Sequence, residues 1–353
     1  MSSPIDILGL ASSDLIDAAR RLLPSGSGVA GKLYARALAT GRLEPEAFGL
    51  SDASCRAWRG AFDVGLLAVR RTVEEEGEHG ATVKAVLATR DGHEIECVRI
   101  PVPAPSGSAP RATLCVSSQV GCRMGCAFCE TGRAGLVRGL TAAEIVSQVV
   151  TTRAVLGWDF RNVVFMGMGE PLDNLGELAR ALRVLTDMRG LRTPAERLTV
   201  CTAGDADGIR GLRELGMRRL NLSVSLNAAD DETRGRLMPV NRRTDLAALA
   251  SVLAAYPQRR SFVLGVNWCL LPGINDSEAD ARGAAEWCAR VGRVYVNVIP
   301  YNPGTRPLCR APTAAETERF LARLRAAGLE AGLRSARGGS IMAGCGQLGA
   351  RPS

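Results

Sequence analysis

The sequence predicts an α/β protein built on a partial (β/α)6 barrel, preceded by a small helical accessory domain and a β-hairpin extension. Three patterns predict this organisation. Apolar residues recur with helix-like spacing in residues 1–80, two alternating runs occupy residues 81–110, and short apolar runs alternate with amphipathic segments in residues 111–353. Such alternation implies a parallel sheet with helical crossovers, and six units favour an open barrel over a closed one of eight strands.

The first 80 residues are expected to form the helical accessory domain. Helix-like spacing appears in residues 12–23 and again in residues 66–76, and the SGSG run at 25–28 predicts a break between helices. The N-terminus has no basic region ahead of an apolar one, which argues against a secretory signal. No apolar run approaches the roughly 18 residues of a transmembrane helix, so we expect a cytoplasmic protein with no membrane partner.

Residues 82–102 are expected to form the β-hairpin. Two strand-like runs meet at Asp91-Gly92, a dipeptide that strongly favours a tight hairpin turn. The stretch PAPSGSAP at 103–110 predicts a connector, and we place a domain boundary there.

The remaining chain supplies the expected TIM-like barrel. Its six predicted strands lie at 112–116, 162–168, 198–204, 220–226, 262–271 and 294–301. Between them run amphipathic segments, of which 142–156 and 316–328 are the clearest predicted helices. In such barrels the chemistry takes place at the carboxyl ends of the strands, where we expect the functional residues.

The cysteine content says more about the possible functions than the net charge does. The net charge of +8, from 44 Lys and Arg against 36 Asp and Glu, fits a nucleic-acid partner and equally a solvated basic surface. The eleven cysteines are more informative, because their number is odd and their spacing uneven. In a chain too large to need disulfide bonds for stability, clustered cysteines indicate metal or redox chemistry.

One cluster, Cys122, Cys126 and Cys129, directly follows the first predicted barrel strand. Three thiolates can bind three irons of a four-iron cluster and leave the fourth iron open to a reactant. A structural zinc site is the alternative, but the histidines, His79 and His93, lie well upstream. The Cx3CxxC spacing, with an aromatic residue before the last cysteine, resembles the signature of radical-SAM enzymes. It implies one [4Fe-4S] cluster and S-adenosylmethionine (SAM).

A second motif, Gly167-Met168-Gly169-Glu170-Pro171, follows the next strand. Glycine lets the backbone approach a ligand closely, and the carboxylate of Glu170 can accept hydrogen bonds from an ammonium group. An ordinary turn is the alternative. The position, one strand after the cysteine loop, matches the SAM-amino-group motif of radical-SAM enzymes.

Two further cysteines stand apart from the cluster. Cys115 lies on the first barrel strand, seven residues before Cys122, and Cys345 lies in the glycine-rich stretch 337–348. Taken separately, each is most simply an inert small apolar residue.

Several separated motifs together resemble the RlmN/Cfr family of radical-SAM methyltransferases, which modify an adenine in RNA. The run TLCVSSQVGCRMGCAFC, the segments GMGEPLDN, SLNAADDETR and IPYNP, and the terminal CGQL occur in the family's order. The resemblance extends from about Glu96 to Leu348 and is looser through the N-terminal helices.

The resemblance implies a mechanism with two SAM molecules per turnover. Cys345 would be methylated first, its methyl group would be activated by radical chemistry and added to the adenine ring, and Cys115 would release the product by forming a disulfide with Cys345. Glu96, in the second strand of the hairpin, would handle the adenine proton or contact its amino group. From the residues alone, Glu96 is more simply an exposed strand carboxylate.

The resemblance also assigns residues to the SAM site. Six positions carry over: Gly169, Glu170, Cys201, Ser225, Asn227 and Asn302. Cys201 stands where the family usually has serine, and Asn227 where histidine is common, so the binding geometry departs from the family pattern. The sequence GGSIMAG before Cys345 lacks the expected acidic residues, which admits a changed substrate.

The implied activity is radical-SAM methylation of adenosine C2 in 23S ribosomal RNA, with transfer RNA as a second candidate substrate. The implied reductant is flavodoxin or ferredoxin, and we expect a monomer. The basic residues of the N-terminal helices would hold RNA through its phosphates: Lys32, Arg36, Arg42, Arg56 and Arg59.

Three alternatives remain open. One is C8 methylation of the same adenosine, which confers antibiotic resistance, and another is a relative that acts on a different RNA or a small molecule. The third belongs to another class, a non-catalytic RNA-binding protein with a structural metal. The presence of both Cys115 and Cys345 argues against this third alternative.

Overall fold

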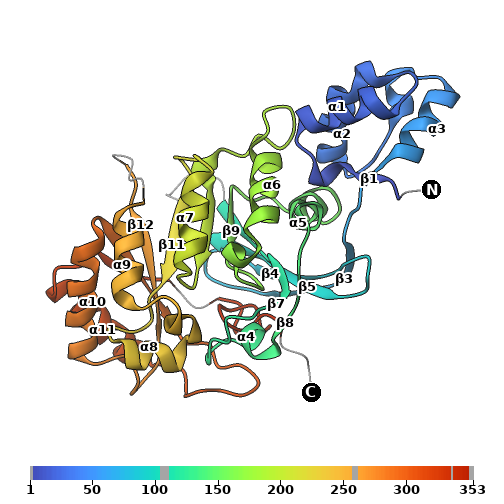
Figure 1. Cartoon of the computed structure of the whole chain (residues 1–353). Coiled ribbons are helices and arrows are strands. Elements are labelled where there is room, and N and C mark those ends of the chain that lie inside the picture. Colours follow the sequence, from blue (N-terminus) through green and yellow to red (C-terminus); the bar gives the residue numbers. More distant parts are fainter. Residues whose placement is uncertain (1–2, 104–110, 257–260, 335–336, 350–353) are drawn as a thin grey trace.

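The computed structural model describes residues 3–103, 111–256, 261–334 and 337–349. Its centre is a sheet of ten strands in the order β14-β13-β12-β11-β10-β9-β6-β5-β4-β3 (Figure 1). In this sheet β6 and the strands β9 to β14 are parallel and form the open barrel, and β5, β4 and β3 extend it antiparallel. The predicted fold class is therefore confirmed.

The N-terminal part is helical, as expected, and Figure 1 shows it at one end of the molecule. Its helices are α1 (Ser12–Leu22), α2 (Ala30–Thr40) and α3 (Asp52–Ala61), with short 3-10 turns η1 (Ile7–Gly9), η2 (Ser27–Val29) and η3 (Pro45–Phe48). The strands β1 (Ile5–Asp6) and β2 (Phe62–Asp63) pair in parallel and join the two ends of this part. Gly26, in the predicted break, has φ +78°.

The helix predicted over 66–76 is wrong, because this segment forms the strand β3 (Ala68–Glu75). Its residues Val69, Thr72 and Val73 are β-branched and suit a strand. β3 pairs antiparallel with β4 (Thr82–Ala88), with a bulge between Val69 and Arg71. Pairing along β4 satisfies the backbone and outweighs the weak helical spacing.

The predicted hairpin is confirmed. Its strands are β4 and β5 (Glu94–Val102), and Gly92 takes φ +85° in the turn between them. β5 pairs antiparallel with β6 (Arg111–Val116), so the hairpin is continuous with the barrel sheet. We call β3, β4 and β5 together the antiparallel extension. The connector predicted at 103–110 lies outside the described residues except for Pro103.

All six predicted barrel strands are present. They are β6, β9 (Asn162–Phe165), β10 (Leu198–Thr202), β11 (Asn221–Ser225), β12 (Leu264–Leu270) and β13 (Val294–Pro300). A seventh parallel strand, β14 (Ala331–Leu333), is too short for periodicity to reveal. β14 and β3 stand at the two ends of the strand order, so the sheet described is open.

Helices follow the barrel strands, and both helices singled out above are confirmed. The helices are α5 (Ala142–Ala154), α6 (Leu175–Thr186), α7 (Ala206–Glu214), α8 (Asp231–Leu237), α9 (Leu246–Ala254), α10 (Glu278–Val291) and α11 (Ala314–Ala326), with 3-10 turns η4 (Pro171–Asn174), η5 (Ala195–Arg197) and η6 (Pro239–Arg242). Capping boxes at Thr141, Ser277 and Thr313 begin α5, α10 and α11.

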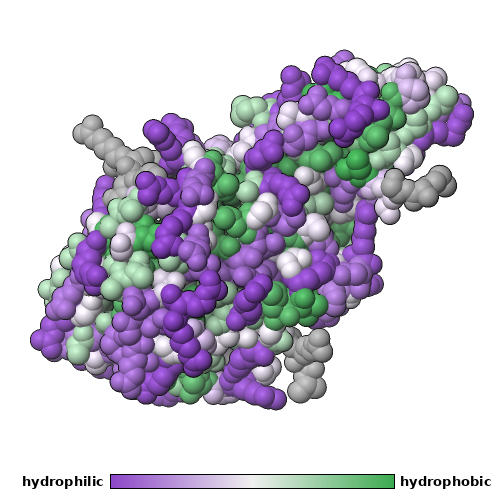
Figure 2. Space-filling model, in the orientation of Figure 1, coloured by the Kyte–Doolittle hydropathy of each residue, from purple (hydrophilic) through white to green (hydrophobic). Residues whose placement is uncertain are grey.

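The core lies between the sheet and these helices. Central strand residues such as Val163, Val200, Leu222 and Val266 are at most 1% exposed. Hydrophilic side chains cover most of the face in Figure 2, and hydrophobic ones appear there as scattered patches. Among the helices described, none is both long and apolar enough to cross a membrane.

Candidate active site

The three clustered cysteines lie between β7 (Gln119–Gly121) and α4 (Glu130–Ala134), close after β6. Cys122, Cys126 and Cys129 line one cavity of about 140 Å³ at the carboxyl ends of the strands. Burial raises the pKa of Cys122 to about 12 and raises the pKa of Cys126 well above its usual value. Buried thiols become thiolates only beside a cation, and bound iron is such a cation.

The three thiols of this loop are the residues that would hold a cluster. In the part of the chain that the structure describes, no three His, Cys, Asp or Glu side chains converge as ligands of one metal ion must. A four-iron cluster carries each thiolate on a different iron and is therefore held from more widely spaced positions. The residues present fit such a cluster with one iron left open.

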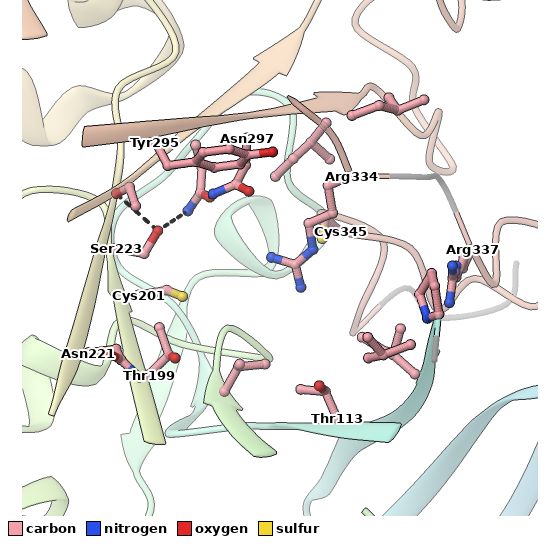
Figure 3. Close-up of a pocket in the computed structure, with 18 of the residues that line it drawn as sticks. Thr113, Thr199, Cys201, Asn221, Ser223, Tyr295, Asn297, Arg334, Arg337 and Cys345 are labelled. Carbon is pink, nitrogen blue, oxygen red and sulfur yellow. Dashed lines mark hydrogen bonds between the residues drawn. The ribbon is translucent and has the colours of Figure 1, made fainter. Parts of the chain in front are cut away.

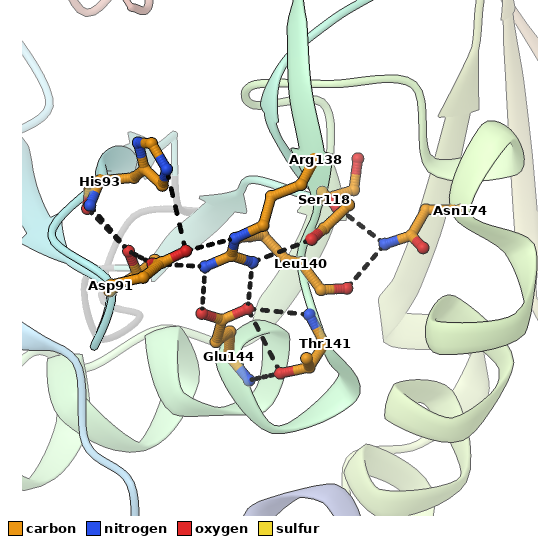
Figure 4. A network of polar contacts seen from close by, with 10 residues as sticks. Asp91, His93, Ser118, Arg138, Leu140, Thr141, Glu144 and Asn174 are labelled. Atoms are coloured by element: carbon orange, nitrogen blue, oxygen red, sulfur yellow. Dashed lines mark hydrogen bonds and ion pairs between the residues drawn. The ribbon is translucent and has the colours of Figure 1, made fainter.

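The cysteine loop is anchored by two neighbouring elements. The backbone N–H of Cys122 donates to the carbonyl of Gly135 at 2.9 Å, and that of Ala127 donates to the carbonyl of Leu237 at 2.9 Å. β8 (Leu136–Gly139) pairs with β7 and carries Arg138, whose guanidinium joins Asp91 of the hairpin turn and Glu144 of α5, each at 2.7 Å (Figure 4). The hairpin and α5 therefore hold the loop in place.

Gly169 and Glu170 lie beside the cysteines, as predicted. Gly169 has φ +100°, and a Cβ there would come within 2.6 Å of the Gln119 side chain, so only glycine fits. The Glu170 carboxylate is 3% exposed and accepts from the backbone N–H of Ala203 at 2.7 Å. Burial raises its pKa to about 7, and an ammonium group bound beside it would lower that pKa again.

The other predicted SAM contacts divide between two cavities. Cys201, Ser225 and Asn227 line the 140 Å³ cavity with the cysteines. Asn302 lines an adjoining cavity of about 550 Å³ and does not line the smaller one. The amide of Asn227 is already engaged, because its oxygen accepts from the N–H of Cys269 at 2.7 Å and its nitrogen donates to a methionine sulfur.

The larger cavity lies inside the barrel, and its lining extends from Asn221 at the start of β11 to Asn302 just after the end of β13 (Figure 3). Its polar wall includes a chain in which Asn297 donates to Asn267 at 3.3 Å and Asn267 donates to Ser223 at 2.9 Å. Arg334 and Arg337 are its charged lining residues, and no described Asp or Glu lines it. A volume of 550 Å³ is typical of a small-molecule site and would accommodate a nucleobase.

Cys345 stands where the two cavities meet, since it lines both. It also lines a third cavity of about 70 Å³ with Cys115 and Arg334. The two cysteines that the family resemblance pairs, 230 positions apart in the chain, therefore line one cavity. All eleven cysteines are free thiols, so the disulfide expected after turnover is not formed in this structure.

Glu96 is buried, contrary to the simple expectation of an exposed strand carboxylate. It is 5% exposed, pairs with Lys84 at 3.1 Å and accepts from the backbone N–H of Gly349 at 3.0 Å. It faces a separate cavity of about 500 Å³ and does not line the cavities of Cys345. In this structure the backbone of Gly349 and the ammonium of Lys84 therefore engage the carboxylate.

Sequence reasoning missed Lys84 and Arg334. Lys84 lies in β4, and since a lysine normally faces water, no local signal marks it as buried. Arg334 follows β14, and its Nη1 donates to the sulfur of Met166, a weak acceptor, at 3.2 Å. Its position eleven residues before Cys345, just ahead of the glycine-rich stretch 337–348, was the available clue.

Comparison with known proteins agrees with this geometry. Residues 116–283 match the model of the radical SAM superfamily. A probable RNA methyltransferase of Sorangium cellulosum is 47% identical over 272 residues, which are 76% of this chain and 66% of that protein. The dual-specificity RNA methyltransferase RlmN of the same species is 38% identical over 345 residues, or 88% of each chain. The crystal structure of a radical SAM methyltransferase from Sphaerobacter thermophilus has TM-score 0.87 and 34% identity over 99% of this chain and 100% of that one.

An open parallel barrel with three cysteines at the carboxyl ends of its strands defines a radical SAM protein, and superfamily membership implies SAM and a four-iron cluster. The relatives place the chain more narrowly. It belongs to the RlmN family of methyltransferases.

Proposed function

We propose that this protein methylates C2 of an adenosine in 23S ribosomal RNA, with transfer RNA as a second substrate. The observation that carries the proposal is the position of Cys345, which lines the cavity of the cluster cysteines, the larger empty cavity and the small cavity of Cys115. A sulfur in this position can receive a methyl group on one side and present it to a base on the other. Relatives named as RNA methyltransferases support the substrate class.

Adenine C2 is a poor nucleophile, so it cannot take a methyl group directly from a sulfonium. When bound, the cluster and two SAM molecules supply one methyl group and the radical that activates it. The chain's own part is to carry that methyl group on the sulfur of Cys345. Once the methyl carbon is joined to adenine C2, Cys115 attacks the sulfur of Cys345 as a thiolate. The Cys115–Cys345 disulfide forms while the bond between that sulfur and the carbon breaks, and the carbon takes up a proton to leave the methylated base. The next turnover needs two external reductants. Flavodoxin or ferredoxin is proposed as the electron donor to the cluster, and a thiol reductant would reduce the Cys115–Cys345 disulfide.

The proposed SAM site uses Glu170 to accept hydrogen bonds from the amino group, beside Gly169, Cys201, Ser225 and Asn227. Asn302 would act from the adjoining cavity. Glu96 would handle the adenine proton or contact its amino group. The burial of Glu96 beside Lys84 supports such a role. Because Glu96 lies outside the cavities of Cys345, it would first have to lose its hydrogen bond from the Gly349 backbone.

We infer that residues 1–80 hold the RNA, residues 81–110 join them to the site, and residues 111–353 carry the chemistry. The charges of Arg36 and Arg59 are paired with Glu44 and Glu46, so Lys32, Arg42 and Arg56 are the stronger candidates for phosphate contacts. We also propose that the protein is a monomer and works in the cytoplasm, where thiols stay reduced.

Product identity tests the proposal. The anaerobically reconstituted protein is incubated with SAM, a reductant and protein-free ribosomal RNA, and the digested nucleosides are compared with standards by mass spectrometry. The expected product is 2-methyladenosine. Finding 8-methyladenosine would establish the C8 alternative, and SAM cleavage with unchanged RNA would reject the RNA substrate. Replacing Cys115 by Ala should trap a covalent protein–RNA adduct, whereas Cys288→Ala, a buried cysteine of α10, should not.

Two observations favour a second candidate, a relative with a different RNA or small-molecule substrate. The side-chain amide of Asn227 is already engaged in hydrogen bonds within the protein, and the segment before Cys345 lacks acidic side chains. Methylation of transfer RNA alone would support it. Zinc in place of iron in a metal analysis would instead revive the non-catalytic alternative.

A further inference from the structure

The segment that carries Cys345 depends on its neighbours for its conformation. Residues 337–349, here called the cysteine segment, form turns and contain no helix or strand. Three charged residues of the antiparallel extension reach it, one from each strand. They are Glu75 of β3, Lys84 of β4 and Glu96 of β5.

Glu75 holds the beginning of the cysteine segment. One carboxylate oxygen accepts from the backbone N–H of Gly338 at 2.7 Å, and the other accepts from the backbone N–H of Ser340 at 2.8 Å and from its hydroxyl. These bonds, the one from the hydroxyl first, hold the pKa of Glu75 below its usual value and keep the carboxylate charged. Charge-assisted bonds to backbone N–H groups are among the stronger contacts available to a turn.

Lys84 holds the middle of the segment, and Glu96 its end. The ammonium of Lys84 donates to the carbonyl of Met342 at 3.0 Å and pairs with Glu96, which accepts from Gly349. The side chains of the pair are 8% and 7% exposed, so water competes little for these groups.

The two flanks of Cys345 are held differently. After Cys345, the barrel supplies contacts: Glu130 N–H to the carbonyl of Gly346 at 2.7 Å, and the hydroxyl of Thr131 to that of Leu348 at 2.5 Å. Before Cys345, the hydrogen bonds described from outside the segment come from the antiparallel extension. They are those of Glu75 and Lys84 and one between Arg337 and the carbonyl of Pro101.

We propose that Glu75 and Lys84 are positioning residues that hold the N-terminal flank of the cysteine segment and thereby keep Cys345 at the junction of the two cavities. The importance of this position rests on the proposed function, in which the sulfur of Cys345 must face SAM and the base in turn. Neither residue touches the reacting atoms. Their role is to limit the positions that a turn-rich segment would otherwise sample.

The experiment measures how fast iodoacetamide alkylates Cys345 in the anaerobically reconstituted protein, with peptide-level mass spectrometry. Losing the charge of Glu75 in Glu75→Gln weakens its three hydrogen bonds to Gly338 and Ser340, so Cys345 should react about tenfold faster. Glu74→Gln changes the adjacent, exposed carboxylate on the same strand and should leave the rate unchanged. Cys309, partly buried outside the segment, serves as the internal reference.

Lys84→Arg keeps the positive charge and a donor for the Met342 carbonyl, so Cys345 should be alkylated at the wild-type rate. Lys84→Met should speed alkylation like Glu75→Gln, and its melting curve shows whether it folds. An unchanged Cys345 rate in folded Glu75→Gln would overturn the proposal. So would an equal rise at Cys309, because that would indicate general loosening.

The two hypotheses can fail separately. If Glu75→Gln exposes Cys345 while the wild-type protein methylates no RNA, the positioning role stands and the proposed function falls. If RNA is methylated and Cys345 reacts equally fast in both proteins, the positioning role falls.

Discussion

Lys84 and Glu96 form an ion pair 3.1 Å long between adjacent strands of the antiparallel extension, with both side chains buried. The strand register opposes Lys84 to Val98 and Glu96 to Val86, so the two charges are diagonal neighbours on one face. The same ammonium and carboxylate also bind the backbone at Met342 and Gly349. The pair thus joins the extension to the segment that carries Cys345.

Breaking this pair should destabilise the protein. Lys84→Met leaves the buried Glu96 carboxylate without its counter-charge, which typically costs about 3–5 kcal/mol. Urea unfolding of the cluster-free protein measures the loss, and Lys32→Met, at an exposed lysine of α2, should change the free energy of unfolding by less than about 0.5 kcal/mol. Equal unfolding curves for the two variants would contradict the buried pair.

Arg334 should govern the reactivity of Cys115. Burial, with a smaller contribution from the neighbouring Cys345, raises the pKa of Cys115 to about 12, and the guanidinium of Arg334 opposes this rise. Arg334→Gln removes the favourable charge and should raise this pKa by about one unit. At a fixed pH below the pKa, the thiolate fraction and the alkylation rate of Cys115 should then fall about tenfold. Arg334→Lys should retain most of the rate, and a Gln variant as reactive as wild type would rule out this influence.

Gly169 should be irreplaceable beside the cluster loop. Gly169→Ala places a Cβ within 2.6–2.8 Å of Gln119 at φ +100°, so the turn must shift. Strain of this kind costs about 1–3 kcal/mol, and SAM should bind about tenfold more weakly in equilibrium dialysis. Gly176→Ala, on α6 with nothing within 4 Å of the added Cβ, should bind SAM normally and melt slightly higher. Normal SAM binding by Gly169→Ala would refute this account of the turn.

The contact between Asp91 and Arg138 predicts a pH effect. The Arg138 guanidinium, aided by the Thr89 hydroxyl, holds the pKa of Asp91 well below its usual 3.8. A carboxyl with a lowered folded-state pKa stabilises the fold above the unfolded pKa and loses that effect as the pH falls through the folded value. Wild type should therefore melt above Asp91→Asn at neutral pH, and the gap should narrow below about pH 4.

Glu94→Gln, at an exposed residue of β5 close to the same turn, is the matched control and should melt like wild type at neutral pH. A melting difference between wild type and Asp91→Asn that stays constant down to the acid limit would show that the contact acts through packing and not through charge.

The sequence by itself determined the features that depend on residues close together in the chain. The spacing of Cys122, Cys126 and Cys129 marked the cysteine loop, Asp91-Gly92 marked the hairpin turn, and short apolar runs marked six barrel strands. In each case a local physical requirement, such as a positive φ at Gly92 or the period of a helix or strand, leaves its pattern within a few residues. The family resemblance added the pairing of Cys115 with Cys345.

Tertiary structure alone decided the rest. The segment 68–75 became a strand because β4 offers it a pairing edge, which its own helix-like spacing could not reveal. Lys84 and Glu96 are buried because the cysteine segment, about 250 residues further along the chain, covers them and uses their charges. Arg334 acts on Cys115 only because β14 brings it to the same cavity. Whether a charged side chain is solvated or buried depends on which distant residues pack over it, and that is decided when the whole chain folds.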